Sequence, residues 1–283
     1  MLESTEYSLL DFGAGRKLER FGEQITDRPC PAAVNATLVA KTEWRQASGK
    51  YVRITADQGR WQPADGLPPE WALNCGSFRL QLKATPFGHL GVFPEQQSNW
   101  DWIARQVRRH GNQPRVLNLF GYTGASSLAA AAAGAQVVHV DAAKNIVQWA
   151  RQNALLSEMQ EAPIRWIVED AARFVTRELK RGNRYDAVIL DPPSYGHGPK
   201  SENWKLSRDL MPLLRDCATL TAKSRLFVLL TCHSPGFGPA ELSACLEDTF
   251  FGRCQSGAIS RGLSIRTEDG RKLDAGVAAR WPA

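Results

Sequence analysis

Three side chains that can do chemistry each follow a short apolar run in the second half of the sequence. They are Asp141, Asp191 and Cys232. A carboxylate accepts hydrogen bonds and can hold an amine, and a thiolate can attack an electron-poor carbon. The apolar runs are typical of buried strands. Since ligands of open α/β sheets bind beyond the carboxyl ends of the strands, we expect these side chains to converge on one rim.

The stretch that ends at Asp141 begins with the apolar run 116–120 and continues through the turn Gly121–Gly124. A small-residue helical segment and a second apolar run follow. Strand, glycine turn, helix, strand and acid is the order of a βαβ nucleotide-binding unit. The glycines let the backbone reach positive φ and approach a ligand closely. Asp141 lies 20 residues after Gly121, where a carboxylate can accept hydrogen bonds from ribose hydroxyls.

The turn reads Gly-Tyr-Thr-Gly rather than G-x-G-x-x-G, so a bound pyrophosphate is not strongly indicated. An adenosine ligand without phosphates, such as S-adenosylmethionine (SAM), fits better than a dinucleotide. Asp170, after the next strand, is expected to meet the adenine amino group. Asp191 lies nearest the middle of the rim, where a methyl group would be transferred. The alternative is a βαβ unit of another α/β protein with a chance acid at position 141.

The step Asp191-Pro192-Pro193 stiffens this corner of the rim. Each proline fixes its own φ, lacks an N–H donor, and moves the preceding residue out of the helical region. The loop therefore presents free carbonyls and a carboxylate, which can position a planar base or an amine. The alternative is a proline-capped strand end with Asp191 solvated.

Cys232 suggests a different chemistry. A thiolate can add to carbon 6 of a pyrimidine and activate carbon 5 toward a methyl cation. Covalent catalysis of this kind requires a lowered thiol pKa and a nearby acid or base, for which His233 and Asp191 are the candidates. The alternative is an inert buried cysteine, because free Cys is among the most buried residue types. His139, within a predicted strand, is expected to be a packing residue.

From Arg115 onward, strand and helix patterns alternate, which predicts a mostly parallel sheet. The predicted strands are 116–120, 136–140, 164–168, 185–190 and 226–231, and the predicted helices are 99–109, 125–133, 144–156, 171–180, 204–219 and 239–249. A terminal antiparallel pair, 258–267 and 273–281, completes a Rossmann-like seven-stranded sheet of the class I methyltransferase kind. The loop 194–202 carries His197, which is placed to meet substrate, and Lys200, which could join a basic rim.

Residues 1–98 are predicted to form a small, mainly β domain, and residues 99–283 the methyltransferase domain. The N-terminal part has short apolar or alternating runs, 33–39, 50–56 and 78–82, between Gly- and Pro-rich turns, which is typical of such a module. The basic segment Gly15–Phe21 is interpreted as either a phosphate contact or a solvated loop.

Composition adds broad limits. The chain has 283 residues, 43% hydrophobic and 23% charged, as in ordinary soluble proteins. No apolar run approaches the roughly 20 residues of a membrane span, and the N-terminus has no signal-peptide pattern, so we expect a cytoplasmic location. None of the six cysteines forms a C-x-x-C pair, so no metal site is expected and the thiols are expected to be free. The net charge of +6 favours a polyanionic partner such as RNA.

Four segments together resemble the large-subunit ribosomal RNA methyltransferase family: NLFGYTGASS, VDAAKN, LDPPSYG and Thr231–Ser234. The resemblance covers residues 85 to 235. The best-known members of the family methylate carbon 5 of cytosine in 23S RNA. The resemblance implies SAM as cofactor, ribosomal RNA as substrate, Cys232 as nucleophile, and contacts to the cofactor by Phe93, Gln96, Phe120, Tyr122 and Thr123. Asp191 is the second predicted catalytic residue. With the residues at the strand ends, the predicted cofactor-binding set is Phe93, Gln96, Phe120, Gly121, Tyr122, Thr123, Gly124, Asp141, Ala142, Asp170, Ala171, Asp191 and Pro192.

Three features depart from that family. No N-terminal RNA-binding PUA module is evident, Gln97 stands where the family has arginine, and Ser194-Tyr195 follows the prolines. The last resembles the D/N-P-P-Y pattern of enzymes that methylate exocyclic amines, where a carboxylate and a carbonyl hold the amine and an aromatic ring stacks on the base. We therefore keep two alternatives: an amine methyltransferase using Asp191 and Tyr195, and a module that binds SAM or RNA without catalysis.

Overall fold

The computed structural model describes residues 5–40, 42–55, 58–63, 65–197, 203–252 and 257–282. The chain divides into two compact units. The first comprises Met1–Gln97 and Ser264–Ala275, and the second comprises Ser98–Leu263 and Gly276–Ala283. The division of the chain at residue 98 into two consecutive domains stays a prediction. The two units differ from that division because residues 264–275 group with the N-terminal residues.

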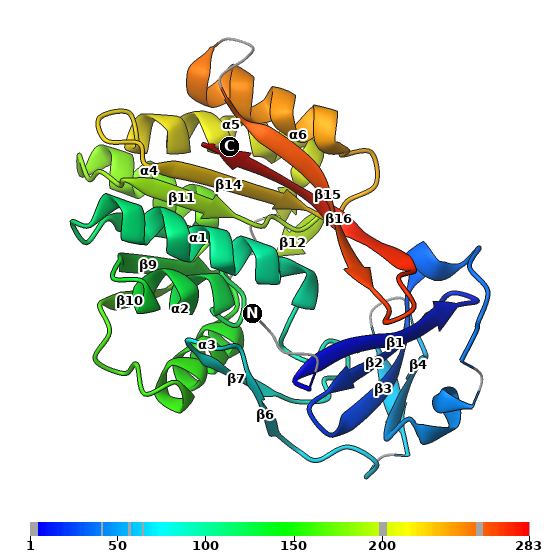
Figure 1. Ribbon diagram of the computed structural model, residues 1–283. Coiled ribbons are helices and arrows are strands. Elements are labelled where there is room, and N and C mark those ends of the chain that lie inside the picture. Colours follow the sequence, from blue (N-terminus) through cyan, green and yellow to red (C-terminus); the bar gives the residue numbers. More distant parts are fainter. Residues whose placement is uncertain are drawn as a thin grey trace. The chain divides into compact units, whose positions relative to one another are not determined.

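A seven-stranded mixed sheet forms the centre of the second unit (Figure 1). Its strands, in spatial order, are β10 (Ile164–Val168), β9 (Gln136–Asp141), β8 (Arg115–Leu119), β11 (Ala187–Leu190), β14 (Phe227–Cys232), β16 (Lys272–Trp281) and β15 (Ile259–Arg266). Strands β10 to β14 are parallel, and β16 is antiparallel to β14. The predicted Rossmann-like α/β sheet is confirmed. The strand order reverses at β8, and ligands of such sheets bind at the carboxyl ends next to this switch point.

Helices cover both faces of this sheet (Figure 1). They are α1 (Gln97–His110), α2 (Ala125–Ala132), α3 (Lys144–Leu156), α4 (Ala171–Lys180), α5 (Leu206–Leu220) and α6 (Pro239–Leu246), the last continued by a π turn, Glu247–Phe251. Because strand side chains alternate between faces, two separate clusters of buried apolar residues form. One joins the sheet to α4, α5 and α6, and the other joins it to α1 and α2.

The segment predicted as a loop, 194–202, is partly a strand. Tyr195–His197 (β12) pairs antiparallel with Asn203–Lys205 (β13). The alternation of small and large residues over so few positions was too short to indicate a strand. Lys200 and the side chain of His197 lie outside the described residues.

The first unit is mainly β, as predicted. Its five-stranded sheet runs β1 (Tyr7–Gly13), β2 (Arg16–Phe21), β3 (Gln24–Pro29), β4 (Gly49–Arg53) and β5 (Gly59–Gln62), with a separate pair β6 (Trp71–Asn74) and β7 (Arg79–Leu82). Single 3-10 turns cover Pro31–Ala33, Glu43–Gln46 and Pro94–Gln96. The interpretation of 33–39 as a strand-like run is wrong: Pro31 starts a turn, and Val34 is 63% exposed.

The basic segment Gly15–Phe21, interpreted as a phosphate contact or a solvated loop, contains strand β2, and charged side chains of this strand form ion pairs within the unit. Glu19 is fully buried and accepts hydrogen bonds from Tyr7 Oη (3.0 Å), Lys17 Nζ (3.0 Å) and Arg28 Nε (3.0 Å). Burial acts to raise the pKa of Glu19, but the two cations outweigh it and hold the pKa below its usual value. Arg28 also donates to the Gly88 carbonyl (3.2 Å). Lys17 therefore forms its ion pair within this cluster of the first unit.

The turn between β15 and β16 contributes an arginine to the first unit. Asp11 is fully buried and accepts hydrogen bonds from the backbone of Val39 (3.0 Å) and Ala40 (2.9 Å), from Trp44 Nε1 (2.7 Å) and from Arg271. A carboxylate buried without a cation would cost several kcal/mol. Arg271 therefore makes residues 264–275 an integral part of this unit.

Candidate functional site

The turn between β8 and α2 has an unusual backbone. Phe120 (φ +56°), Tyr122 (φ +49°) and Gly124 (φ +92°) all adopt left-handed conformations. For residues with a side chain this region costs energy and is enriched at functional sites. A Cβ at position 124 would lie 3.1 Å from that of Ala150 in α3. Helix α3 therefore packs directly against the turn and holds it in this shape.

A buried histidine lies beneath the turn. A Cβ at Gly121 would lie 2.4 Å from His139 Cε1, so only glycine fits there. Nδ1 of His139 is 3.0 Å from Ser127 Oγ, which accepts a hydrogen bond from Asn118 Nδ2 (2.8 Å). Burial lowers the pKa of His139 to about 3, so the imidazole is neutral. The prediction that His139 is a packing residue is confirmed.

Asp141 ties the turn to the end of β9. Its Oδ2 accepts a hydrogen bond from Tyr122 N (3.0 Å), and its Oδ1 accepts one from Ala143 N (3.0 Å). Burial raises the pKa of Asp141, and these backbone N–H groups partly oppose the rise. The backbone N–H of Ala142 also hydrogen-bonds to this carboxylate, whose two oxygens offer about four acceptor positions. The carboxylate can therefore still accept a hydrogen bond from a ribose hydroxyl while fixing the turn.

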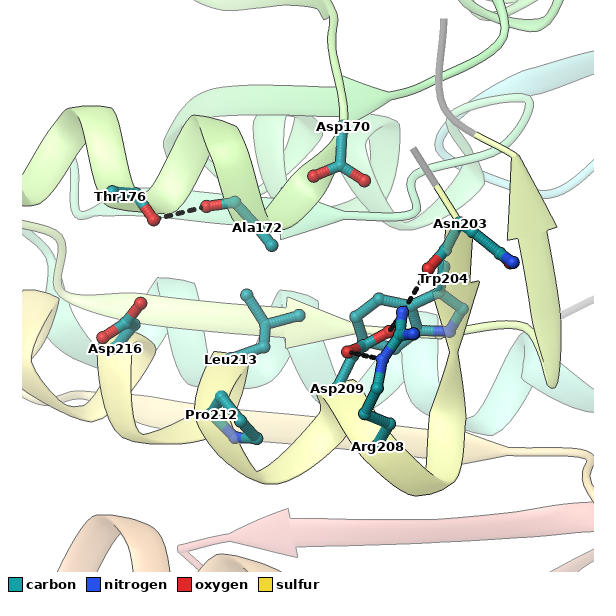
Figure 2. A pocket seen from close by; sticks show the side chains of 10 residues that line it. All are labelled: Asp170, Ala172, Thr176, Asn203, Trp204, Arg208, Asp209, Pro212, Leu213 and Asp216. Atoms are coloured by element: carbon teal, nitrogen blue, oxygen red, sulfur yellow. Dashed lines mark hydrogen bonds and ion pairs between the residues drawn. The ribbon is translucent and has the colours of Figure 1, made fainter. Parts of the chain in front are cut away.

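Asp170 follows β10 and caps helix α4, accepting a hydrogen bond from Arg173 N (2.9 Å). It also borders a cavity of about 320 Å³ between α4 and α5, where it lies across from Trp204 (Figure 2). The Trp204 ring in turn packs on Phe120, with centroids 5.0 Å apart. Of the predicted site residues, Asp170 alone lines this cavity. The remaining lining residues are Ala172, Thr176, Asn203, Arg208, Asp209, Pro212, Leu213 and Asp216.

A second set of polar side chains lies where strands β11 and β14 end. Thr231 Oγ1 donates a hydrogen bond to Asp191 Oδ1 (2.6 Å), and His233 Nε2 is 3.7 Å from the same oxygen. The hydroxyls of Ser194 and Ser234 are hydrogen-bonded to each other. Two side-chain links therefore join the proline loop to the end of β14 and to the segment that follows it.

The loop after the prolines is also braced from the other side. Trp204 Nε1 donates to the Pro193 carbonyl (2.8 Å), and Gly196 pairs with Trp204 in the β12–β13 hairpin. Tyr195 remains 70% exposed. The hairpin thus presents an aromatic side chain four residues after Asp191.

Cys232 lies below the rim. Its side chain is 1% exposed and belongs to the apolar cluster beneath α5 and α6. Neighbouring strand side chains point to opposite faces, so Thr231 contacts Asp191 whereas Cys232 enters the core. Its sulfur accepts a hydrogen bond from Ser234 N (3.4 Å). The structure thus brings Thr231 and His233 to Asp191, and it leaves the thiol buried.

The described residues contain no helix long and apolar enough to cross a membrane. Within the same ranges, no group of three or more His, Cys, Asp or Glu side chains could hold a metal ion.

The profile of the S-adenosylmethionine-dependent methyltransferase family matches residues 15–250. The protein belongs to this family. A solved structure described as the SAM-dependent methyltransferase from Agrobacterium tumefaciens is 36% identical, covers 98% of this chain and 91% of that one, and has a TM-score of 0.91. SMU.776, described as a methyltransferase complexed with S-adenosylhomocysteine, shares the fold at 18% identity, with 98% and 75% coverage and a TM-score of 0.74.

Curated relatives include the ribosomal RNA large subunit methyltransferase K/L of Hahella chejuensis, 32% identical over 193 residues, which are 68% of this chain and 25% of that protein. The ribosomal RNA large subunit methyltransferase I of Salmonella arizonae is 34% identical over 90 residues, 31% of this chain and 22% of that protein. The chain spans about a quarter of the length of these relatives. Membership of an enzyme family argues against the non-catalytic module considered from the sequence.

The glycine turn and Asp141 fit the cofactor of this methyltransferase. The close approach at Gly121, the left-handed turn and the carboxylate of Asp141 could hold a nucleoside, and their assignment to the cofactor stays a prediction. Thr123, whose carbonyl accepts a hydrogen bond from Asn153 Nδ2 (2.8 Å), is part of the same turn. The remaining predicted residues are placed by their elements: Ala142 after β9, Ala171 at the start of α4, and Pro192 after Asp191.

Phe93 and Gln96 belong to the first unit of the methyltransferase. Phe93 packs against His89, with ring centroids 5.8 Å apart, and Gln96 is 7% exposed. Their contact with the cofactor stays a prediction. Sequence reasoning did not assign roles to Ser127, Asn118 or Thr231, because short polar residues within helices and strands carry no signal of which partner they will meet.

Proposed function

We propose that this SAM-dependent methyltransferase methylates a base of RNA, with ribosomal RNA as the substrate class. SAM supplies an electrophilic methyl group on a sulfonium. The single observation that carries the proposal is the partly exposed carboxylate of Asp191, held by Thr231 at the carboxyl end of the strand next to the switch point. The printed names of the curated relatives and the net charge of +6 support RNA as the partner.

For the target atom, we infer an exocyclic amine of the base. The Asp191 side chain is 31% exposed, and among the described residues no partner is recorded for its Oδ2. That oxygen can accept a hydrogen bond from an amine N–H and so orient the nitrogen lone pair. Tyr195 provides an exposed ring on which the base can stack. This arrangement needs no nucleophile from the protein.

The second candidate is cytosine carbon 5, with Cys232 as the nucleophile. It is favoured by the position of Cys232 at the end of β14, directly after the threonine that contacts Asp191. The thiol would have to leave the apolar cluster to reach a base. At 1% exposure, this requires a rearrangement of the segment 232–234, which the amine mechanism does not.

The test uses RNA from cells that lack the protein, SAM with a labelled methyl group, and mass analysis of the product nucleosides. Cys232→Ala should keep turnover within a few-fold if the target is an amine, and should abolish it if Cys232 is the nucleophile. Cys217→Ala, in the same apolar cluster but within α5, is the matched control for packing. Asp191→Asn should lower kcat by about 10²–10³, the scale for losing one group that stabilises a transition state. Absence of label in any RNA would refute the substrate class.

A further inference from the structure

Two arginines meet at the start of helix α1, and a third lies further along the same helix. Arg280 lies on β16, Arg261 on β15 and Arg105 on α1. The Ser98 hydroxyl accepts hydrogen bonds from Nη2 of Arg280 (3.0 Å) and from Nη2 of Arg261 (3.3 Å). Burial, followed by the positive charges of Arg261 and Arg105, lowers the pKa of Arg280 to about 10. Two guanidinium groups therefore converge on one neutral hydroxyl, and the charge of Arg105 also acts on Arg280.

Among the described residues, Arg280 lacks a carboxylate partner such as the one that the equally buried Arg28 has. Arg280 is 8% exposed; its Nε donates to Asn99 Oδ1 (2.9 Å), and its guanidinium lies over the Trp102 ring at 5.4 Å. Arg28 and Arg271, by contrast, each pair with a buried carboxylate. In the part of the chain that the structure describes, no ion pair within 4.0 Å is recorded for Arg105, Arg261 or Arg280.

A purely structural role explains only part of this arrangement. Arg280 alone would join α1 to β16 through its bond to Asn99. That role does not require Arg261 on the same hydroxyl, because a second cation there only adds repulsion. Asp101 acts on Arg280 from a longer range and in the opposite direction, so one negative charge faces three positive ones. The site is electrostatically incomplete without an anion.

We propose that Arg105, Arg261 and Arg280 bind a phosphate of the RNA backbone. The inference rests on the proposed RNA substrate. Guanidinium groups match the geometry of phosphate oxygens in bidentate pairs. Contacts to phosphates fix the register of a nucleic acid on a protein and carry no sequence information. This cluster therefore positions the RNA strand, and the choice of base belongs to the rim around Asp191.

The double variant Arg105→Gln/Arg261→Gln tests the site, and Arg108→Gln/Arg109→Gln, exposed on the same helix, removes the same charge elsewhere. Binding of a single-stranded RNA oligonucleotide is followed by fluorescence anisotropy between about 50 and 200 mM salt. We expect the slope of log K against log salt to fall by about 0.7 for one lost phosphate contact. Affinity at about 100 mM salt should fall several-fold more than in the control variant, and SAM affinity by calorimetry should be unchanged.

If the two double variants lose salt-dependence slope and RNA affinity equally, the proposed phosphate site is wrong. The proposal that the protein methylates RNA would still stand. If the unaltered protein shows no salt-dependent RNA binding and no transfer to RNA, the substrate class itself fails, and the phosphate site fails with it. Thermal unfolding of both variants checks that each remains folded. Arg280→Lys keeps the positive charge but loses the planar guanidinium group. This variant should bind RNA measurably more weakly, and its unfolding temperature should change only slightly.

Discussion

Acid should destabilise the second unit through a single residue, His139. The imidazole has a pKa near 6.5 in an unfolded chain and about 3 in the fold, where it is fully buried. As pH falls below 6.5, the unfolded chain binds a proton that the folded chain does not bind until near pH 3. The stabilisation is thus fully present above 6.5 and is lost as pH falls. Between pH 7.5 and pH 5, about 1.5 units below 6.5, the loss is about 2 kcal/mol.

The perturbation is His139→Asn, which removes the titration and keeps a polar group on the side chain. The variant should be less stable at pH 7.5, because it leaves a cavity beneath Gly121. Its free energy of unfolding should nevertheless fall by about 2 kcal/mol less than that of the unaltered protein between pH 7.5 and pH 5. Urea unfolding at the two pH values, followed by tryptophan fluorescence, measures the difference.

His110→Asn is the matched control, because His110 is exposed at the end of α1. This variant should retain the full pH dependence. Carboxylates contribute equally to all three proteins and cancel in the comparison. Parallel pH dependences for the unaltered protein and His139→Asn would refute the account of a neutral, buried imidazole below the glycine turn.

Three further outcomes follow from the site and from the first unit. Asp141→Ala should weaken SAM binding by about 1–3 kcal/mol, the cost of unpaired polar groups, and calorimetry showing unchanged affinity would mean that the ribose is held elsewhere. Gly121→Ala should destabilise the protein by about 1–3 kcal/mol and lower SAM affinity, because the new Cβ meets His139; a gain in melting temperature would contradict this. Arg28→Met should cost about 3–5 kcal/mol by leaving Glu19 buried without its main partner, and this loss should shrink as the carboxylate is protonated at low pH.

The sequence predicted the methyltransferase sheet well because its signals are local. Apolar runs such as Val116–Phe120 recur at helix-sized intervals, and Gly134 marks the end of a helix. The boundaries agree with the structure to within a few residues. The N-terminal strands were harder to predict, since β2 reads as a basic loop until Lys17 is paired with Glu19 of the same strand and Arg16 with Asp27 of β3.

The site was predictable in position but not in detail. Asp141 and the glycine turn could be recognised because a fixed spacing places them at one edge of the sheet. The orientation of the Cys232 side chain could not be predicted from the sequence. A residue at the last position of a strand can face either side of the sheet, and the register of β14 decides which. Asp170 similarly follows a strand, and the start of α4 determines that one of its oxygens caps the helix.

The pairing of Asp11 with Arg271 has a consequence for how the chain is made. Most strands of the first unit leave the ribosome before those of the second, yet the first unit includes residues 264–275. Until those residues emerge, a carboxylate in its core lacks the cation that compensates it. Folding of the first unit during synthesis is therefore expected to stay incomplete until residues 264–275 have been translated, and a fragment of residues 1–97 should be prone to aggregation.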